Sequence, residues 1–288
     1  MELDENTKKQ IEFIDKSSTK FKEIAQMEQG RKKDKFKNLG GELFNTARNF
    51  EKEIKKVNSK ALKYHRYKYG SLIMVNYGLG VDAELCGNHF SIVLSNNDTP
   101  FDSLITVIPL TSKNGKNRLS LGELLPYMFL NYRKNILQEM TDEAKELDNE
   151  ITDILNNLKN FFIEKFGEEK TNQILEQKEV SIDEPINLPQ ELVDKFNNCV
   201  KKNSEYSKNY DNFTKTFERY QTKNRISYVI TNQIKTISKF RVLEPQNEYD
   251  PINKLLVPKE ILLKIEHELI KKYFSKAEKL NKTSVDKK

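Results

Sequence analysis

The stretch YGSLIMVNYGLGVDAELCGNHFSIVLSNNDTPFDSLITVIPLTS, residues 69–112, is the least charged long segment of this chain. Within it, three runs of apolar and β-branched residues lie at 72–75, 91–94 and 104–110. Each run is bounded by Gly, Asn, Asp or Pro, which are the residues that favour turns. The pattern therefore predicts three consecutive strands of a small, strongly bent sheet.

The segments on both sides of this stretch have the periodicity of helices. Residues 5–66 are helical in character, with breaks expected at Gly30 and at the pair Gly40–Gly41. Two later segments alternate steps of three and four residues between apolar positions, which is typical of a heptad seam. The seam residues are Leu137, Met140, Ala144, Leu147, Ile151, Ile154, Leu158 and Phe161 in the first segment, and Leu192, Phe196, Cys199, Asn203, Tyr206, Tyr210, Phe213, Phe217 and Tyr220 in the second.

Residues 167–189 separate the two heptad segments and contain Pro185 and Pro189. Two helices of similar length joined by a break are expected to fold back on each other. The prediction is an antiparallel coiled-coil hairpin. In it, Asn203 takes a core position that sets the register, and Cys199 is a small buried apolar side chain.

Further strands are expected at 118–121, 226–230 and 235–242, and a helix is expected to start at Pro258. The predicted fold class is α+β. The domains are an N-terminal helical extension at 1–67, a sheet domain formed by 68–126 with 221–275, the inserted hairpin at 127–220, and a flexible tail at 276–288. Without the hairpin, the sheet domain has an ordinary domain size.

Composition limits the choice of compartment and partner. The apolar fraction is 36%, the charged fraction 32% and the net charge +6, so an acidic partner such as RNA is compatible with the chain. Cys86 and Cys199 lie far apart in unlike contexts, which indicates a reducing compartment. No apolar run reaches the roughly 20 residues of a membrane span, and the N-terminus is not a signal peptide. The predicted location is the cytoplasm.

Four short segments occur in a distinctive order. They are YGSLIMV at 69–75, the loop with Glu84 and Gly87 that leads into the second strand, IPLTS at 108–112, and QIKTISK at 233–239. In this order and spacing the chain resembles the MazF/PemK family of toxin endoribonucleases. The resemblance covers the predicted sheet domain and neither the N-terminal helices nor the hairpin.

The resemblance implies an SH3-like barrel with a C-terminal helix, usually a homodimer that an antitoxin protein inhibits. It also implies metal-independent cleavage of single-stranded RNA, in which the 2′-hydroxyl attacks its own phosphate and leaves a cyclic phosphate and a 5′-hydroxyl. The catalytic threonine of the family falls on Thr111. The catalytic arginine falls on His89, and the proline that follows it in the family is Phe90 here.

Histidine is a chemically reasonable replacement, because an imidazole both accepts and donates protons near neutral pH. It lacks the permanent charge of arginine. The predicted catalytic residues are therefore His89, Thr111 and Ser112, and positive charge and RNA contacts are expected from Lys113, Gln233, Lys235 and Arg241. The pattern of His, Cys, Asp and Glu has no metal spacing, so neither a metal nor another cofactor is expected.

Two other functions stay open at the level of sequence. The barrel can be a catalytically silent binding module that uses the hairpin for protein partners, which the loss of the family arginine favours. The second alternative is a purely structural coiled-coil protein, and this alternative leaves the four ordered segments unexplained. A further hypothesis is that the N-terminal helices cover the RNA groove, with Glu51 and Glu53 as candidate acidic groups.

Overall fold

The computed structural model describes residues 4–27, 36–59, 63–176, 186–221 and 226–274. The predicted tail at 276–288, Gly30 and most of the basic run 31–37 lie outside these ranges. The fold is α+β, and the chain divides into two compact units. The sheet unit comprises 1–124, 225–245 and 252–288, and the helical unit comprises 125–224 and 246–251. None of the helices in the described ranges is long and apolar enough to cross a bilayer.

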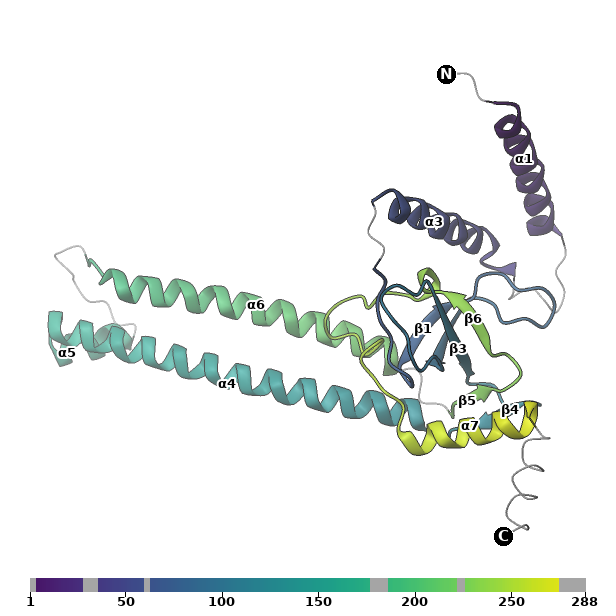
Figure 1. The fold of residues 1–288 in the computed structure, drawn as a ribbon. Coiled ribbons are helices and arrows are strands. Elements are labelled where there is room, and N and C mark those ends of the chain that lie inside the picture. Colours follow the sequence, from purple (N-terminus) through teal and green to yellow (C-terminus); the bar gives the residue numbers. More distant parts are fainter. Residues whose placement is uncertain (1–3, 28–35, 60–62, 177–185, 222–225, 275–288) are drawn as a thin grey trace, which may run out of the picture. The chain divides into compact units, whose positions relative to one another are not determined.

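The elements follow one another in the order expected for strands interrupted by long helices (Figure 1). They are α1 Glu5–Gln26, α3 Leu39–Asn58, β1 Leu72–Asn76, β2 Asn88–Val93, β3 Leu104–Thr111, β4 Arg118–Ser120, α4 Leu124–Phe166, α5 Glu168–Leu175, α6 Gln190–Gln221, β5 Tyr228–Ile230, β6 Lys235–Ser238, the 3₁₀ turn η2 Lys239–Arg241, and α7 Lys259–Tyr273.

The strands form one six-stranded sheet in which every pairing is antiparallel. The order is β1-β2-β3-β5-β4, and β6 also pairs with β3. β3 is therefore the central strand, because its eight residues pair with three others. An isolated bridge joins Val75 of β1 to Val242 after η2, but the sheet is not closed.

One buried cluster of the sheet unit lies on one face of these strands, and Leu72, Ile92 and Ile108 are fully buried on the other face. Ile73 and Val75 of β1 alternate toward this cluster, as Ile105 and Val107 of β3 do, in the period of two that a pleated strand imposes. The strands at 72–75, 91–94 and 104–110 are thus found close to their predicted bounds. Full burial of such side chains contributes roughly 1.5–3 kcal/mol each. The cluster contains Tyr67, Ile73, Val75, Tyr77, Val93, Ile105, Val107, Ile237 and Val242.

The strand predicted at 235–242 is wrong in its second half. β6 ends at Ser238, whose hydroxyl accepts a hydrogen bond from Phe240 N at 3.3 Å and so caps the turn η2. Lys239 then points inward, where its Nζ lies 2.7 Å from Oδ1 and 2.9 Å from Oδ2 of Asp98. A buried ion pair thus draws the chain away from strand geometry.

Two expectations in the N-terminal region are also wrong. Gly40 and Gly41 do not break a helix but lie in the first turn of α3, where no atom stands within 4 Å of an added Cβ. A first turn tolerates glycine better than a helix centre does. His65 was expected on a helix, yet it lies in an extended segment with its ring centroid 4.6 Å from that of Tyr67.

In the helical unit, α4 and α6 lie side by side and run antiparallel (Figure 1). Phe129 and Tyr132, near the start of α4, contact Tyr220 and Phe217, near the end of α6, with ring centroids 4.8 and 6.2 Å apart. Farther along α4, Glu150 meets Lys202 of α6 at 2.5 Å. The loop 246–251 belongs to this unit as well, a feature that the sequence prediction missed.

That loop is held by polar contacts to α6. Asp250 is fully buried, accepts a hydrogen bond from the Tyr220 hydroxyl at 2.7 Å, and lies 4.0 Å from Arg219. Thr216 donates to the side chain of Asn247 at 3.1 Å. These contacts cover the aromatic end of α6, which explains why Phe213, Phe217 and Tyr220 are buried although only two helices pair.

Only about half of the predicted heptad seam is buried. Met140 and Leu147 are buried in α4, and Cys199 is buried as expected in α6, whereas Asn203 is exposed and does not take the core position predicted for it. A single partner helix covers a narrower strip than a full seam, so one set of heptad positions faces outward. The exposed seam residues are Leu137, Ile151, Phe196, Asn203 and Tyr210.

Candidate functional site

The loop 77–87 between β1 and β2 is the place where the predicted site residues meet. It is compact, because Tyr77 N donates to Gly87 O and Gly87 N donates to Gly78 O, both at 2.9 Å. Side chains from β2, from the turn before β6, from β6 and from η2 all contact it. The loop thus joins parts of the sequence that lie on either side of the long helices.

His89 is the second residue of β2, and its side chain is half-buried against this loop. Its Nε2 lies 3.1 Å from Cys86 O and its Nδ1 lies 3.2 Å from Leu110 O. The ring also packs edge-on against Tyr77, with centroids 6.2 Å apart. Both nitrogens therefore face backbone carbonyls, and a neutral imidazole, which has one N–H, satisfies only one of them at a time.

The protonation of His89 reflects two opposed effects. Burial lowers its pKa below the usual value, because a charged imidazolium loses hydration, while the carbonyls of Leu110 and Cys86 raise it. The nearby charges of Arg118 and Lys113 lower it further. Burial is the largest cause, so the net direction is downward, and the ring is neutral at pH 7.

Thr111 ends β3 and lies beside His89. Pro109 pairs with Ser91, and the same register continued by two residues sets Thr111 opposite His89. The Leu110 carbonyl that contacts the imidazole belongs to the preceding residue. The Thr111 hydroxyl accepts a hydrogen bond from Lys113 N at 3.2 Å, which turns the chain after the strand.

Ser112 and Lys113 follow in that turn and are both exposed. Lys113 is near enough to affect the pKa of His89. No described contact joins Ser112 to the imidazole, and the groups of this segment that act on His89 are the Leu110 carbonyl and the Lys113 charge.

Arg118 is a site residue that the sequence interpretation missed. It opens β4 and pairs with Ile230 of β5, and its charge acts on His89. Its own pKa is lowered by burial, so the guanidinium is partly desolvated. The signal for it was the turn 113–117 with Gly115, after which the chain returns beside β5, the strand between β4 and β3. A guanidinium charge on a different strand than the resemblance implies therefore lowers the pKa of His89, although no described contact joins the two side chains.

The remaining predicted residues reach the loop from the far side of the helical insertion. The Gln233 amide donates to Ala83 O at 3.2 Å, and the Lys235 ammonium lies 5.7 Å from the centre of the Tyr77 ring. A guanidinium nitrogen of Arg241 stands 3.2 Å from the point where a Cβ on Gly78 would lie. The three side chains thus border the same loop as His89, although no described contact joins them to Thr111.

Cys86 has a structural role in this loop. Its sulfur accepts a hydrogen bond from Gly80 N at 3.3 Å and donates to Glu84 O at 3.3 Å. In the described ranges, no group of three or more His, Cys, Asp or Glu side chains is arranged to hold a metal ion.

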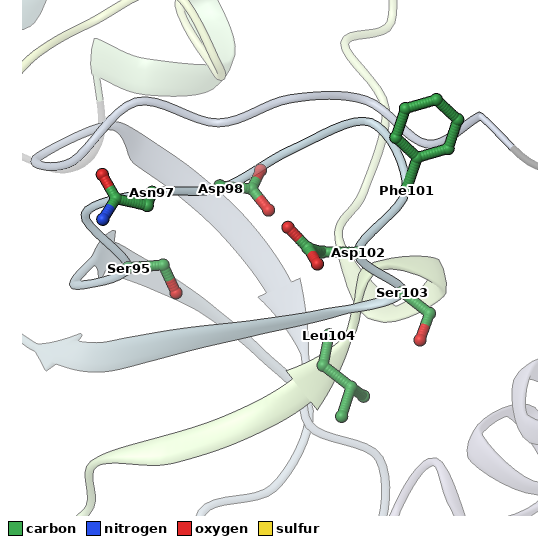
Figure 2. A pocket seen from close by; sticks show the side chains of 7 residues that line it. All are labelled: Ser95, Asn97, Asp98, Phe101, Asp102, Ser103 and Leu104. Carbon is green, nitrogen blue, oxygen red and sulfur yellow. The ribbon is translucent and has the colours of Figure 1, made fainter.

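A hollow of about 380 Å³ lies at the opposite end of β3, and Figure 2 shows its lining. Asp98, which lines this hollow, is paired with Lys239. Asp102 accepts hydrogen bonds from the backbone N and the hydroxyl of Thr99, both at 2.8 Å. β3 separates this hollow from Thr111 by roughly 23 Å at 3.3 Å per residue. It is therefore not part of the predicted site.

Helix α3 contacts the sheet next to His89. Asn76 donates to Glu42 of α3 at 3.0 Å and to Asn88 of β2 at 2.9 Å. Glu51, expected as an acidic cover, is instead paired with Lys55 on its own helix at 2.5 Å. The carboxylate of α3 that reaches the sheet is thus Glu42.

A comparison of the chain with protein-family models, with curated proteins and with solved structures found no match in any of the three.

Proposed function

We propose that the protein is a metal-independent endoribonuclease of the toxin type, acting on single-stranded RNA at His89. The observation that carries the proposal is the position of the imidazole. It lies one peptide from Thr111, with the charges of Lys113 and Arg118 acting on it. This combination supplies a neutral base, a hydroxyl and permanent positive charge, which are the groups that transesterification of a phosphodiester needs.

In the proposed reaction, His89 accepts the proton of the 2′-hydroxyl as this oxygen attacks the adjacent phosphorus. The bond from phosphorus to the 5′-oxygen breaks and this oxygen takes a proton from water, which leaves a cyclic phosphate and a 5′-hydroxyl; the proton on His89 then returns to solvent. Arg118 and Lys113 offset the charge on the phosphoryl oxygens. The ring has to leave one of its two carbonyl partners to take up the proton, so RNA binding includes a small movement of the loop 77–87.

The proposal includes an SH3-like barrel built on the six-stranded sheet. The antiparallel order and the bridge between Val75 and Val242 support it. It also includes a coiled coil formed by α4 and α6, supported by their antiparallel contacts. A homodimer, an antitoxin partner and a cytoplasmic location remain predictions from the resemblance and the composition.

The test is incubation of the purified full-length protein with long single-stranded RNA in the presence of EDTA. We expect cleavage with 5′-hydroxyl and cyclic phosphate ends, and a loss of about 100-fold or more in His89→Ala and in Arg118→Ala. Lys116→Ala removes a charge from the same turn and is the matched control, with cleavage within about twofold of wild type. Absence of cleavage in wild type, or equal cleavage in all variants, contradicts the proposal.

A second function has its own support. Both nitrogens of His89 face backbone carbonyls, as in a histidine that fixes a loop rather than one that moves protons. In this alternative the sheet unit is a catalytically silent binding module, and α4 with α6 binds protein partners. It predicts no cleavage of any RNA by wild type, together with loss of stability in His89→Ala.

A further inference from the structure

Helix α3 turns a polar side toward the sheet. Polar side chains recur every three or four residues along this side, and we call them the polar row. One end of the row contacts β1, where Glu42 accepts a hydrogen bond from Asn76 at 3.0 Å. Near the other end, the Lys56 ammonium lies 5.9 Å from the centre of the Phe240 ring in η2. The polar row consists of Glu42, Asn45, Asn49, Lys52 and Lys56.

The apolar side chains of α3 point away from the polar row. Phe50 and Ile54 are each 61% exposed, and Val57 is 65% exposed. An amphipathic helix ordinarily packs its apolar side against the core. The orientation of α3 is reversed, so the space between this helix and the sheet is lined by groups that can bind a polar ligand.

A cavity of about 200 Å³ lies between the middle of the polar row and the sheet. Its volume is below the roughly 300–1,000 Å³ of a pocket for a drug-sized molecule, so it suits a single ring system. Phe240 lines it on the side of the sheet. The side chains that line it from α3 are Asn45, Arg48, Asn49 and Lys52.

The α3 side chains in this cavity keep their hydrogen-bonding capacity for a ligand. Within the described part of the chain, Asn45, Asn49 and Lys52 form no hydrogen bond or ion pair. The Arg48 guanidinium lies 6.0 Å from the centre of the Phe44 ring, a contact that leaves its N–H groups available. Two cations thus face one carboxylate in the lining, that of Glu244, and the cavity is positive.

Asn76 joins this cavity to the candidate site. It is 6% exposed, its Oδ1 accepts a hydrogen bond from Gly78 N of the loop 77–87 at 2.9 Å, and its Nδ2 donates to Asn88 at 2.9 Å. Asn88 also lines the cavity and directly precedes His89 in β2, so the two side chains point to opposite faces of the strand. A strand of RNA that passes round this end of β2 reaches both.

We propose that the cavity holds one nucleotide of single-stranded RNA that flanks the bond cleaved at His89. The base lies against Phe240, the two asparagines of α3 form hydrogen bonds with its edge, and the two cations of α3 pair with its phosphate. A ring with donors and acceptors joined to an anion is the ligand that this combination of groups fits. The inference rests on the proposed function, because cleavage at His89 makes RNA the expected source of the nucleotide.

The direct test uses the full-length protein and two fluorescein-labelled oligomers of eight units. One is 2′-fluoro RNA of mixed sequence, which lacks the attacking hydroxyl and therefore cannot be cleaved. The other is an abasic deoxyribose-phosphate chain of the same charge. By fluorescence anisotropy, we expect the base-bearing oligomer to bind at least about fivefold more tightly, the lower end of what one stacked base contributes.

A first pair of substitutions tests the contacts with the base. Asn45→Ala combined with Asn49→Ala should weaken binding of the 2′-fluoro RNA at least about fivefold and leave binding of the abasic chain unchanged. Alanine favours a helix more than asparagine does, so circular dichroism should show the same helix content. Asn58→Ala, at an exposed position on the opposite side of α3, is the matched control and should change neither affinity.

A second pair tests the contacts with the phosphate. Arg48→Gln combined with Lys52→Gln should weaken binding of both oligomers. It should also reduce the dependence of log K on log salt concentration by about 0.7 for each phosphate contact that is lost. Lys37→Gln combined with Lys271→Gln removes two exposed charges outside the cavity and should change this slope less.

Equal affinity of the wild type for the two oligomers overturns the inference. So does a preference for bases that persists in Asn45→Ala with Asn49→Ala, and an effect of the charge variants alone marks an anion-binding surface without a base site. Because the 2′-fluoro RNA cannot be cleaved, the two proposals fail separately. Base-dependent binding through the asparagines without cleavage of natural RNA refutes the proposed function alone, whereas cleavage that depends on His89 with base-independent binding refutes this inference alone.

Discussion

At the scale of single residues, the candidate site combines a histidine predicted from the sequence with an arginine that the sequence interpretation missed. The antiparallel pairing of β2 with β3 brings His89 Nδ1 to 3.2 Å from the carbonyl oxygen of Leu110, the residue before Thr111. The charge of Arg118, on β4, lowers the pKa of His89. A loss of charge at one position of a motif is therefore compatible with charge restored from elsewhere in the fold.

The lowered pKa of His89 predicts a stability that depends on pH. The unfolded chain protonates its imidazole near pH 6.5, whereas the folded ring stays neutral to lower pH. The contribution is therefore fully present above pH 6.5 and is lost as the pH falls toward the folded pKa. We expect the urea midpoint to fall between pH 7 and pH 5, and to fall less in His89→Gln.

The matched control is His267→Gln, which changes an exposed histidine on α7. It should keep the wild-type slope. Identical slopes for wild type and His89→Gln would show that burial of His89 does not affect its protonation.

The buried ion pair of Asp98 and Lys239 predicts a large cost for a single substitution. Asp98→Ala leaves the ammonium of Lys239, which is 3% exposed, without its carboxylate and removes the acceptor of Tyr67 N. We expect a loss of about 3–5 kcal/mol in the free energy of unfolding. In the Asp98→Ala background, Lys239→Met should recover a large part of the lost free energy of unfolding, because it removes the unpaired charge. Denaturant unfolding measures this, and a further loss of free energy in the double variant would contradict the argument.

At the scale of elements, the helix α7 contacts the chain at both edges of the sheet. α7 packs through Leu262 on Gly70, just before β1, and the Tyr69 hydroxyl donates to Glu266 of the same helix. Burial raises the pKa of Tyr69, and this hydrogen bond raises it further. Lys272 of α7 donates to Asn117 at 2.7 Å and to Thr231 at 3.0 Å, the residues that flank β4 and β5. The helix predicted from Pro258 thus joins both ends of the sheet.

The contact between α7 and the chain before β1 predicts the effect of two glycine substitutions. Gly70 has φ +80°, and an added Cβ would lie 2.7 Å from a methyl group of Leu262. Gly87 has φ +70° with no atom within 4 Å. Gly87→Ala should cost about 1–2 kcal/mol from backbone strain alone, and Gly70→Ala should cost more, by about 1–3 kcal/mol of overpacking.

Thermal unfolding of the two alanine variants measures the difference. Equal losses would mean that Leu262 moves away without cost, so that α7 does not limit the space at Gly70.

At the scale of the whole molecule, two units have separate cores. The sheet unit buries the cluster around Ile73 and Val107, and the helical unit buries Met140 with Phe213 and Phe217. The segment 125–224 leaves the sheet after β4 and returns before β5, and these two strands pair directly. The insertion therefore joins the sheet at two neighbouring strand ends.

Separate cores predict that damage to one unit stays local. Leu147→Ala, at a position 7% exposed in α4, should lower the free energy of unfolding of the helical unit by about 2–4 kcal/mol. Leu155→Ala, at a position 58% exposed in α4, should change the same free energy of unfolding by less than about 0.5 kcal/mol. Calorimetry should show the helical transition shifted by Leu147→Ala, and a different transition shifted by Gly70→Ala; a common shift in both variants would indicate one cooperative unit.

The sequence by itself determined the elements and their order, because alternation in strands 72–75 and 104–110 and the three-to-four spacing in 137–161 are local properties of the chain. It also singled out His89 and Thr111. Only the tertiary structure decided that Lys239 turns inward to Asp98, that the charge of Arg118 acts on His89, and that five of the seventeen heptad seam residues remain exposed. These outcomes depend on which distant groups share a buried space and on how many helices pack together, and neither is encoded in the spacing of neighbouring residues.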